Sequence, residues 1–594
     1  MSAAPQKQSD RRRIFLSNGF TGAIVLDGSI DWFPCPKFDS PSIFSKILDD
    51  RTGGYFSIKP ELPYKIRTSY IEDTLVARNE FSTSKGVLNV TDFLPIGNTG
   101  IIRIYESKVP FIADISPLFG YGMINPGVEQ TDGGLIFRNR GSEEGLEVRI
   151  DGKYGMVEDS TVRVEPGKGS IFALYSKDLR YGLFSNKGFV YPEPYDTFHK
   201  TVRYWRDQLS VARRVKKYEH AYKRSIETVL GLIYLPSGAV IAAPTTSLPE
   251  IVGKGRNWDY RYMWVRDASY AAEALANSGY ILKSKRIIDF MLSVLDPSSK
   301  SFNHPLYSID GTSPPPEEHM DWLNGNCGSK PVRVGNSAYM QVQMDTEGAF
   351  VNALYTYISM TGDKVYAIEA WWAIEAIIEW VRKSWKLPST SIWEERDTLR
   401  HFVHTKVMQW VAVDRAHKIA LMIGYKDKAE EMLELGEKIK SEVMAKGFSK
   451  PLNSFTQYYG SKEVDAALLT LPLYGFIDAK DPKFLSTLRR IERDLVVDNG
   501  LVMRYKYDMM GDAAHPFTLT STWLARVYLL LGDVKKAERS IGTLIQCSTD
   551  HELIAEHIDI KTREPRGNFP QLFPHAGLIH AIADLDMVAA GKKG

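Results

Sequence analysis

Residues 256–267 combine four aromatic and five charged side chains within twelve positions. Neither helical nor strand spacing sorts these side chains into an apolar face and a polar face. Aromatic rings cover the C–H faces of a ligand, while Arg and Asp form charge-assisted hydrogen bonds at its edges. The mixture suits a wall that binds a flat, hydroxyl-rich ligand. An aromatic cluster at an interdomain seam, with structural ion pairs, is the alternative.

Two glutamates in aromatic surroundings add acid–base chemistry to this wall. Glu394 follows Trp393 directly, and Glu556 lies far along the chain. Glycoside hydrolysis needs one carboxylic acid to protonate the leaving oxygen and a second carboxylate that acts as base or nucleophile. We expect the apolar indole of Trp393 to desolvate Glu394, as a general acid requires. The alternatives are a first-turn role for Glu394 and Glu395 in a helix that starts near Thr398, and a surface loop charge for Glu556.

These residues fall in the second half of the chain, which has the texture of twelve helices. The predicted helical segments are 218–234, 265–278, 281–296, 343–360, 364–384, 398–421, 425–446, 463–472, 482–493, 516–531, 534–546 and 573–589. Tight turns containing glycine alternate with long loops between them. Helices that alternate in direction place every second connection at the same end, and long loops in compact domains are usually functional. We predict an (α/α)6 barrel over residues 218–594, with all the long loops at one mouth.

Several of these long loops carry aromatic, arginine and carboxylate side chains. Besides 256–267, the segments concerned are 330–336, 391–396, 453–459, 501–507, 553–557 and 567–571. The tight turns at the other end mostly lack such residues, so the mouth is the predicted site.

The first part of the chain has strand-like texture. Residues 22–26 and 29–33 flank an Asp-Gly turn at 27–28, which is a strong hairpin signal. Further short β-branched and aromatic runs follow without helices between them. We predict a disordered tail at 1–13, an antiparallel β-sandwich domain at 14–191 and a helical linker at 192–217.

The composition excludes several classes of function. The 594 residues carry 74 basic and 72 acidic side chains, a net charge of +2, which argues against nucleic acid or an anionic membrane as the main partner. The three cysteines, Cys35, Cys327 and Cys547, show no metal-ligand spacing, and we expect no metal or other cofactor. Neither a signal peptide nor a membrane span is evident, so we expect a cytoplasmic protein. The low content of Gln and Cys is typical of proteins from hot habitats. The sequence leaves the oligomeric state open, including a homo-oligomer.

Four motifs occur in order, each on a different long loop. They are Asn-Trp-Asp-Tyr-Arg-Tyr at 257–262 with Trp264, Arg266 and Asp267; Pro-Val-Arg-Val-Gly-Asn at 331–336; Trp-Glu at 393–394; and Gly-Asn-Phe-Pro-Gln at 567–571. With residues 28–32 and 38–42 near the start, they make the chain resemble glycoside hydrolase family 15, the glucoamylase-like family, in its bacterial and archaeal two-domain form. The resemblance covers nearly the whole chain and implies a β-sandwich followed by an (α/α)6 barrel.

The resemblance implies a role for each matching residue. Glu394 matches the family's general acid, and Glu556 the general base that activates water. Arg266 and Asp267 match the pair that grips the hydroxyls of the terminal glucose. The full set of implied substrate-binding residues is Tyr260, Trp264, Arg266, Asp267, Arg333, Trp393, Arg396 and, at a position that varies among prokaryotic members, Glu395.

We therefore predict an inverting, exo-acting α-glucoside hydrolase that releases β-glucose from the non-reducing ends of α-glucans or maltooligosaccharides. Trehalase, the same mechanism acting on trehalose, is the alternative, because archaeal and actinobacterial members of the family also show that activity. Residues 321–328 depart from the family's usual Leu-Pro-Gly-Tyr type segment beside the aglycone subsite, so the leaving group stays open. Pro574-His575 also stands where Ser-His is commoner.

A glycoside phosphorylase and a non-catalytic sugar-binding protein are further alternatives. A phosphorylase needs only one carboxylate, so Glu556 argues against it, and a binding protein needs neither. Glu394 and Glu556 lie in the loops after the fifth and eleventh helices, opposite one another in a ring of twelve. We expect their separation to fall in the inverting range of about 6.5–9.5 Å, rather than the roughly 5–5.5 Å of retaining enzymes.

Overall fold

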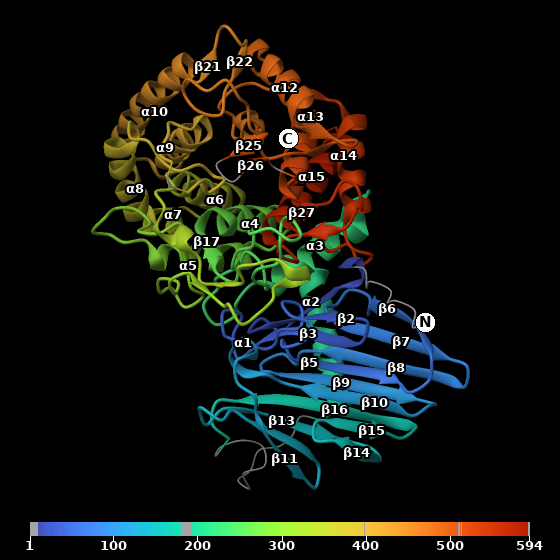
Figure 1. The fold of residues 1–594 in the computed structure, drawn as a ribbon. Helices are drawn as coiled ribbons and strands as arrows, with labels where there is room; N and C mark the ends of the chain where they lie inside the picture. The colour runs from blue at the N-terminus through green and yellow to red at the C-terminus, as the bar shows by residue number, and fades with distance from the viewer. Residues whose placement is uncertain (1–9, 180–192, 397, 509–510, 513, 592–594) are drawn as a thin grey trace.

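The computed structural model describes residues 10–179, 193–396, 398–508, 511–512 and 514–591, which form a β domain followed by a helical domain (Figure 1). The β domain consists of two antiparallel sheets of eight strands each, so the predicted sandwich is confirmed. The predicted hairpin is also present, with Leu26 paired to Ser29 across a turn whose two residues both have positive φ.

The first sheet has the order β1-β2-β3-β5-β10-β15-β14, with β4 paired to β3. Its strands are β1 (Ile14–Ser17), β2 (Gly22–Leu26), β3 (Ser29–Pro34), β4 (Ser42–Phe44), β5 (Tyr55–Pro60), β10 (Phe111–Ser116), β14 (Tyr154–Glu158) and β15 (Thr161–Val164). Burial alternates along β10, as expected of a strand with one face in the core.

The second sheet has the order β11-β12-β13-β16-β9-β8-β7-β6. Its strands are β6 (Tyr64–Tyr70), β7 (Ala77–Thr83), β8 (Gly86–Phe93), β9 (Gly100–Ser107), β11 (Gly127–Thr131), β12 (Gly134–Arg138), β13 (Gly145–Ile150) and β16 (Gly167–Ser176). Side chains from both sheets form one core, to which Phe56, Val90 and Val148 belong. A short turn of helix, α1 (Phe119–Gly122), follows β10.

The start of the chain corrects the prediction of a disordered tail over 1–13. Residues 1–9 lie outside the described residues, but Asp10–Arg12 form a 3-10 helix, η1. Arg11 contacts Asp550 at 3.2 Å, and Arg12 contacts Asp27 at 2.8 Å. The predicted tail therefore does not extend over residues 10–13, because these ion pairs attach them to both domains.

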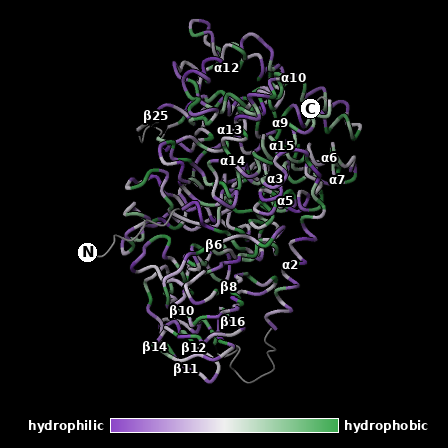
Figure 2. Tube along the Cα trace, turned by 90° about the vertical axis from the view of Figure 1, so that its right-hand side faces the viewer, coloured by the Kyte–Doolittle hydropathy of each residue, from purple (hydrophilic) through white to green (hydrophobic). Residues whose placement is uncertain are grey.

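Helix α2 (Pro194–Ser210) provides the predicted helical linker. It begins with proline at its first position, and the Glu193 side chain caps it by accepting from the Asp196 amide. Val202, Trp205 and Leu209 are buried, and the helix contacts both β9 and α3. Figure 2 shows α2 beside the β domain and below α3. The predicted domain boundary at residue 191 lies outside the described residues.

The helical domain is an (α/α)6 barrel, as predicted. The helices that form it are α3 (Glu219–Gly231), α4 (Val265–Asn277), α5 (Ile281–Val294), α6 (Thr346–Thr361), α7 (Lys364–Glu369), α8 (Trp371–Ser384), α9 (Val403–Ile423), α10 (Lys426–Lys446), α11 (Thr470–Leu473), α12 (Pro482–Asp494), α13 (Thr518–Leu531), α14 (Val534–Cys547) and α15 (Leu572–Ala589). Within the described ranges, none of the helices is long and apolar enough to cross a membrane.

Six of these helices close an inner ring. α4 contacts α6, α6 contacts α9, α9 contacts α11, α11 contacts α13, α13 contacts α15, and α15 returns to α4. Inner helices such as α13 and α15 are buried on almost every side, whereas outer helices such as α10 and α12 bury one face. The ring thus places the long loops around a common axis.

Three segments differ from the prediction. The fifth is interrupted at Ala370 into α7 and α8, and the eighth is the 3-10 helix η5 (Ala466–Leu469) followed by one turn, α11. The sixth, α9, begins at Val403 instead of Thr398. Glu394 and Glu395 therefore lie in a loop, which removes the alternative of a first-turn role for them.

The long loops contain short two-stranded ladders and 3-10 turns that give them fixed shapes. The ladders are β17 (Met263–Trp264) with β18 (Leu306–Tyr307), β19 (Glu318–His319) with β20 (Arg333–Val334), β21 (Phe448–Ser449) with β22 (Ser454–Phe455), β23 (Val496–Val497) with β24 (Leu501–Val502), β25 (Tyr507–Asp508) with β26 (Gly511–Asp512), and β27 (His557–Ile558) with β28 (Pro565–Arg566). The turns are η3 (Asn326–Gly328) and η4 (Ser337–Met340).

The β domain supports the wall of the mouth from below. Trp32 Nε1 donates to the Pro244 carbonyl at 2.6 Å, and Arg261 Nη1 donates to the Ser40 carbonyl at 2.7 Å. Arg261 is fully buried and pairs with Asp259, also through a 2.7 Å contact. Segment 321–328, which departs from the family's usual sequence, also contacts the β domain. Both the backbone and the side-chain nitrogen of Asn324 donate to Asp49 at 2.8 Å.

Candidate functional site

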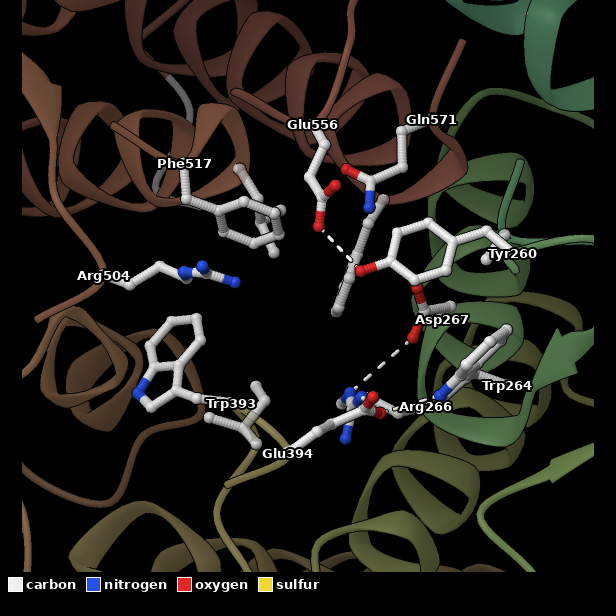
Figure 3. A pocket seen from close by; sticks show the side chains of 14 residues that line it. Tyr260, Trp264, Arg266, Asp267, Trp393, Glu394, Arg504, Phe517, Glu556 and Gln571 are labelled. Carbon is white, nitrogen blue, oxygen red and sulfur yellow. Dashed lines mark hydrogen bonds and ion pairs between the residues drawn. The ribbon is translucent and has the colours of Figure 1, made fainter. Parts of the chain in front are cut away.

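Two adjoining cavities open among the loops at the mouth of the barrel. The inner one spans about 520 Å³ and the outer one about 880 Å³, and both volumes include space that is open to solvent. Four residues line both cavities and so mark their junction: Tyr260, Trp393, Glu394 and Arg504. The inner cavity also contains Trp264, Arg266, Asp267, Phe517, Glu556 and Gln571, and Figure 3 shows Glu394 and Glu556 on opposite sides of it.

Glu394 is presented by a tight turn in the loop before α9. Its backbone nitrogen donates to the Ser391 carbonyl at 3.0 Å, and its φ of 61° is left-handed, a strained conformation for a residue with a side chain. Its Oε1 accepts hydrogen bonds from Trp264 at 2.7 Å, from Gln343 at 3.1 Å and from Arg266 at 3.2 Å. Because three donors occupy Oε1, a proton on this carboxyl group belongs on Oε2.

The surroundings of Glu394 differ from the expected ones. The sequence predicts that Trp393 desolvates the carboxylate, but the Glu394 side chain is 22% exposed and meets donors through Oε1. Trp393 Nε1 donates instead to Asp465 at 2.8 Å, and the indole lies near the rings of Tyr505 and Phe517. Trp393 is therefore a fixed wall shared by the two cavities.

Arg266 and Asp267 occupy the first turn of α4, at the inner end of the cavity. Arg266 donates to Gln343 at 2.8 Å and contacts Asp345 at 3.2 Å. Burial raises the pKa of Asp267 to about 7, against the opposing effect of Arg266. Asp267 Oδ2 is buried and has no hydrogen-bond partner among the described residues. A buried acceptor of this kind is ready to receive a ligand hydroxyl.

Glu556 lies across the inner cavity, at the start of the loop that carries β27 and β28. It is 2% exposed, and its Oε1 accepts a hydrogen bond from the Tyr260 hydroxyl at 2.7 Å. Burial is the main cause that raises the pKa of Glu556, and the nearby Glu250 carboxylate adds to it, while Arg504 opposes the shift. The tyrosine hydroxyl fixes which way the carboxylate points.

Gly567 leaves the space that the Glu556 carboxylate occupies. A Cβ at this position would lie 2.4 Å from Glu556 Oε2 and 2.8 Å from its Cβ. The φ of Gly567 is +78°, which also disfavours any other residue. The first glycine of the Gly-Asn-Phe-Pro-Gln motif is thus required by the side chain of Glu556, as well as by the backbone.

The remaining predicted site residues belong to the outer cavity or support it. Glu395 lines it and accepts from Gln457 at 3.3 Å. Arg396 also lines it and pairs with Glu317 at 2.9 Å. Arg333, by contrast, is not among the residues that line the two cavities. Its guanidinium lies 4.3 Å from the ring centroid of Trp258 and donates to the Asn257 carbonyl at 2.7 Å, so it supports the wall.

Several residues of the mouth receive no role from the sequence. Arg504 and Gln571 lie in loop segments that stand out by their composition, yet only the fold shows that they face the inner cavity. Gln571 Oε1 is a second buried acceptor without a partner among the described residues. The other residues placed here by the structure alone are Glu250, Gln341, Gln343, Asp345 and Phe517.

Comparisons with known proteins agree with this architecture. The family Glycosyl hydrolases family 15 matches residues 216–548, and the domain Trehalase-like, N-terminal matches residues 4–164. Trehalase 2 of Sulfolobus acidocaldarius is 52% identical over 96% of this chain and 99% of its own length. Trehalase 1 of the same organism is 42% identical over 96% and 98%. A bacterial glucoamylase complexed with acarbose has the same fold, with a TM-score of 0.75 over 98% of this chain and 95% of that one at 13% identity.

The buried carboxyl group of Asp267 predicts a pH-dependent effect on stability. Its folded pKa of about 7 lies above the ordinary 3.8, so its ionisation destabilises the fold increasingly between these values and fully above pH 7. Each unit of this difference is worth about 1.4 kcal/mol. We expect Asp267→Asn to raise the melting temperature at pH 8 by roughly 2 °C or more, with little change near pH 4.

Asp296→Asn is the control of opposite sign. Hydrogen bonds from Asn303 and Ser298 hold the pKa of Asp296 below its usual range, so its stabilising contribution is present above pH 4 and this variant should melt earlier at pH 8. Equal shifts of Asp267→Asn at both pH values would show that ionisation of Asp267 has no part in the effect.

Proposed function

The chain belongs to glycosyl hydrolases family 15, and from that premise we propose that it is a trehalase. One observation carries the proposal: relatives named trehalase are 52% and 42% identical to it over 96% of the chain. The predicted glycoside hydrolase family is confirmed. The α-glucan substrate that the sequence favours is less well supported than the trehalose alternative, because the glucoamylase match at 13% identity shows the fold alone.

The two cavities support binding of a disaccharide across their junction. One glucose unit would occupy the inner cavity, where Asp267 and Gln571 offer acceptors to its hydroxyls. The leaving glucose would occupy the outer cavity, between Trp258 and Tyr505. The glycosidic oxygen would then lie at the junction, beside Glu394.

The proposed reaction uses the two carboxyl groups on opposite sides of the inner cavity. Glu394 donates its proton from Oε2 to the glycosidic oxygen, and the bond from that oxygen to the anomeric carbon breaks. Glu556 accepts a proton from a water molecule whose oxygen forms the new bond to the anomeric carbon from the other face. The configuration at that carbon is inverted.

The charges of the outer cavity support a neutral leaving group. Three arginines and three glutamates line it: Arg256, Arg396, Arg504, Glu250, Glu394 and Glu395. A site for a phosphorylated sugar would need an excess of positive charge over its carboxylates. This balance favours an unmodified sugar such as the second glucose of trehalose.

Initial rates on trehalose, maltose, isomaltose and soluble starch test the substrate. We expect trehalose to be hydrolysed fastest, and proton NMR taken before mutarotation to show α-glucose and β-glucose in equal amounts. Inversion at one of the two α-linked carbons requires this ratio. Two equivalents of α-glucose would contradict the role of Glu556 as a water-activating base, and a higher rate on maltose would contradict the substrate.

Replacement of each carboxyl group tests the division of roles. We expect Glu394→Gln and Glu556→Gln to reduce turnover of trehalose by about 10²–10⁴-fold or more, with Glu375→Gln on outer helix α8 as an unaffected control. On α-glucosyl fluoride, whose leaving group needs no proton, Glu394→Gln should recover much of its activity and Glu556→Gln should not. If Glu556→Gln retains more than about a tenth of the wild-type rate on trehalose, it is not the base.

Gly567→Ala tests the packing around Glu556. The added methyl group would displace the carboxylate, so we expect turnover to fall by about 10²-fold, since a shift of about 1 Å has effects of that size. Gly532→Ala is the matched control, because Gly532 has a similar φ of +81°, but a methyl group added there would meet no atom of the described residues within 4 Å. Both variants should lose stability through the positive φ, and Gly567→Ala should lose more, because its methyl group also overlaps Glu556. Equal kinetics in the two variants would show that Gly567 serves only the backbone.

A further inference from the structure

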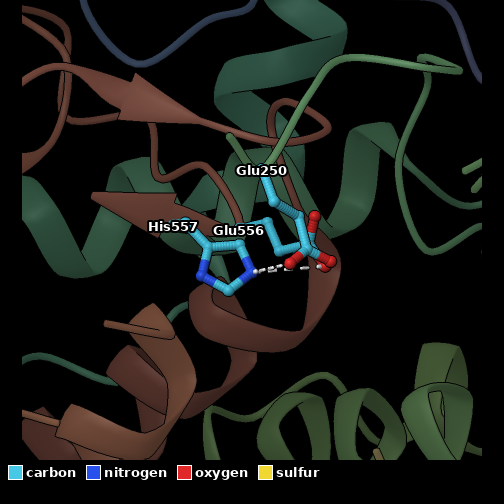
Figure 4. Close-up of side chains that lie close together, drawn as sticks. All are labelled: Glu250, Glu556 and His557. Carbon is cyan, nitrogen blue, oxygen red and sulfur yellow. Dashed lines mark ion pairs between the residues drawn. The ribbon is translucent and has the colours of Figure 1, made fainter. Parts of the chain in front are cut away.

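A second buried carboxylate, Glu250, lies close to Glu556 (Figure 4). It is 5% exposed, and its backbone is tied to the loop of Glu556, since the Gly567 nitrogen donates to the Pro249 carbonyl at 2.9 Å. Ligand atoms of Glu250, Glu556 and His557 all lie within 4.8 Å of one another. Two carboxylates this close in a buried site repel each other when both are ionised.

Arg504 supplies the positive charge that this pair requires. Its Nη2 contacts Glu250 Oε2 at 2.6 Å, and its side chain lines both cavities at the junction. One guanidinium thus serves two carboxylates, of which only Glu250 is in direct contact with it. The charge on Glu250 therefore takes up much of the stabilisation that Arg504 would otherwise give to Glu556.

His557 indicates where a proton resides in this cluster. Its Nδ1 lies 3.2 Å from the Pro516 carbonyl, which can only accept, so Nδ1 carries the hydrogen. Burial keeps the imidazole neutral by lowering its pKa well below the usual value. Its Nε2 lone pair faces Glu250 Oε2 at 3.5 Å and Glu556 Oε1 at 3.8 Å without a hydrogen bond. The lone pairs of His557 Nε2 and of the two carboxylates therefore face one another, and a proton bound by one of these groups would relieve their repulsion.

We infer that Glu250 is a positioning residue that, together with Arg504 and His557, decides whether Glu556 is ionised and able to act as a base. The inference rests on the proposed role of Glu556. While Glu250 is charged and paired with Arg504, the same guanidinium stabilises the ionised form of Glu556 less. Glu556 therefore keeps its proton more readily than it would without Glu250. Glu250 thereby sets the acidic limit of activity without contacting the anomeric carbon itself.

A metal ion is the other occupant that this ligand set would suit. Two carboxylates and an imidazole are common metal ligands. In this cluster, however, the Arg504 guanidinium already contacts Glu250, and Arg256 and His515 line the same side. A divalent cation would have to be held against these groups, so the positive charge of the cluster is assigned to Arg504.

In the described part of the chain, the charged and titratable groups facing Glu556 come from four segments. They are Glu250 in the loop before 256–267, Tyr260 within that stretch, Arg504 after β24 and His557 in β27. Glu250 raises the pKa of Glu556, and Arg504 lowers it together with the Tyr260 hydrogen bond. Removing the charge of Glu250 should therefore lower the pKa of Glu556, and removing Arg504 should raise it.

The pH profile of kcat/KM for Glu250→Gln tests this inference. Because Glu556 must be ionised to act, activity is lost as pH falls through its pKa. We expect the acidic limb of the profile to move to lower pH by about one unit or more, the usual effect of a charge at this distance. Glu250→Asp keeps the charge and should leave the limb near its wild-type position, even where kcat falls. Arg504→Gln should move the limb to higher pH, which keeps the test decisive if Glu250→Gln does not fold.

Two results separate this inference from the proposed function. If Glu556→Gln is inactive while the limb is unmoved in both Glu250→Gln and Arg504→Gln, Glu250 has only a structural role. If Glu556→Gln remains active, the assignment of the base fails first. The limb is measured on whichever α-glucoside the protein hydrolyses, so the choice between trehalose and maltose does not affect the outcome. Glu375→Gln again controls for the loss of one carboxylate elsewhere.

Discussion

Two buried guanidinium groups, Arg266 and Arg504, hold the carboxyl groups of the mouth in place. A buried charge is stable only where opposite charges and hydrogen bonds surround it. Arg266, at the start of α4, meets Asp345 before α6 and Glu394 before α9. Arg504, after β24, meets Glu250 from a loop far earlier in the chain. Arg266 therefore links three long loops and Arg504 links two, and the closed ring of inner helices brings those loops to the same end.

The β domain contributes to the site through the same kind of interaction. The buried pair of Asp259 and Arg261 lies inside the aromatic stretch, and Arg261 also binds the Ser40 carbonyl of the β domain. The stretch is thus fixed between the two domains, while its Trp258, Tyr260 and Trp264 side chains line the cavities of the mouth. Both explanations of its composition apply: part of it forms a domain seam, and part of it forms the wall of the cavities.

Some residues at the mouth adopt an unfavourable backbone conformation or carry unpaired buried oxygens at the positions where a ligand would bind. Glu394 has a left-handed φ of 61°, and Asp267 and Gln571 carry buried oxygens without hydrogen-bond partners among the described residues. Such features persist only when the surrounding structure fixes them. Sugar hydroxyls would donate hydrogen bonds to both oxygens, so binding would remove this unfavourable contribution. The large apolar core shared by the barrel and its interface with the β domain offsets this destabilisation.

The sequence alone determined the order of a β domain and a helical barrel and most of the helical segments, and it singled out the two glutamates as candidates. Short strands, periodic apolar residues and glycine turns are local signals, and the four motifs preserve the order of the loops. The sequence placed Arg333 in the site and left Arg504, Gln571 and Glu250 without a role, and it predicted that Trp393 covers Glu394. Only the tertiary structure decided these points, because a side chain's direction and its partners depend on loops that are distant in the chain. The donors around Glu394 and the carboxylate beside Glu556 belong to other segments, so no spacing within one motif can reveal them.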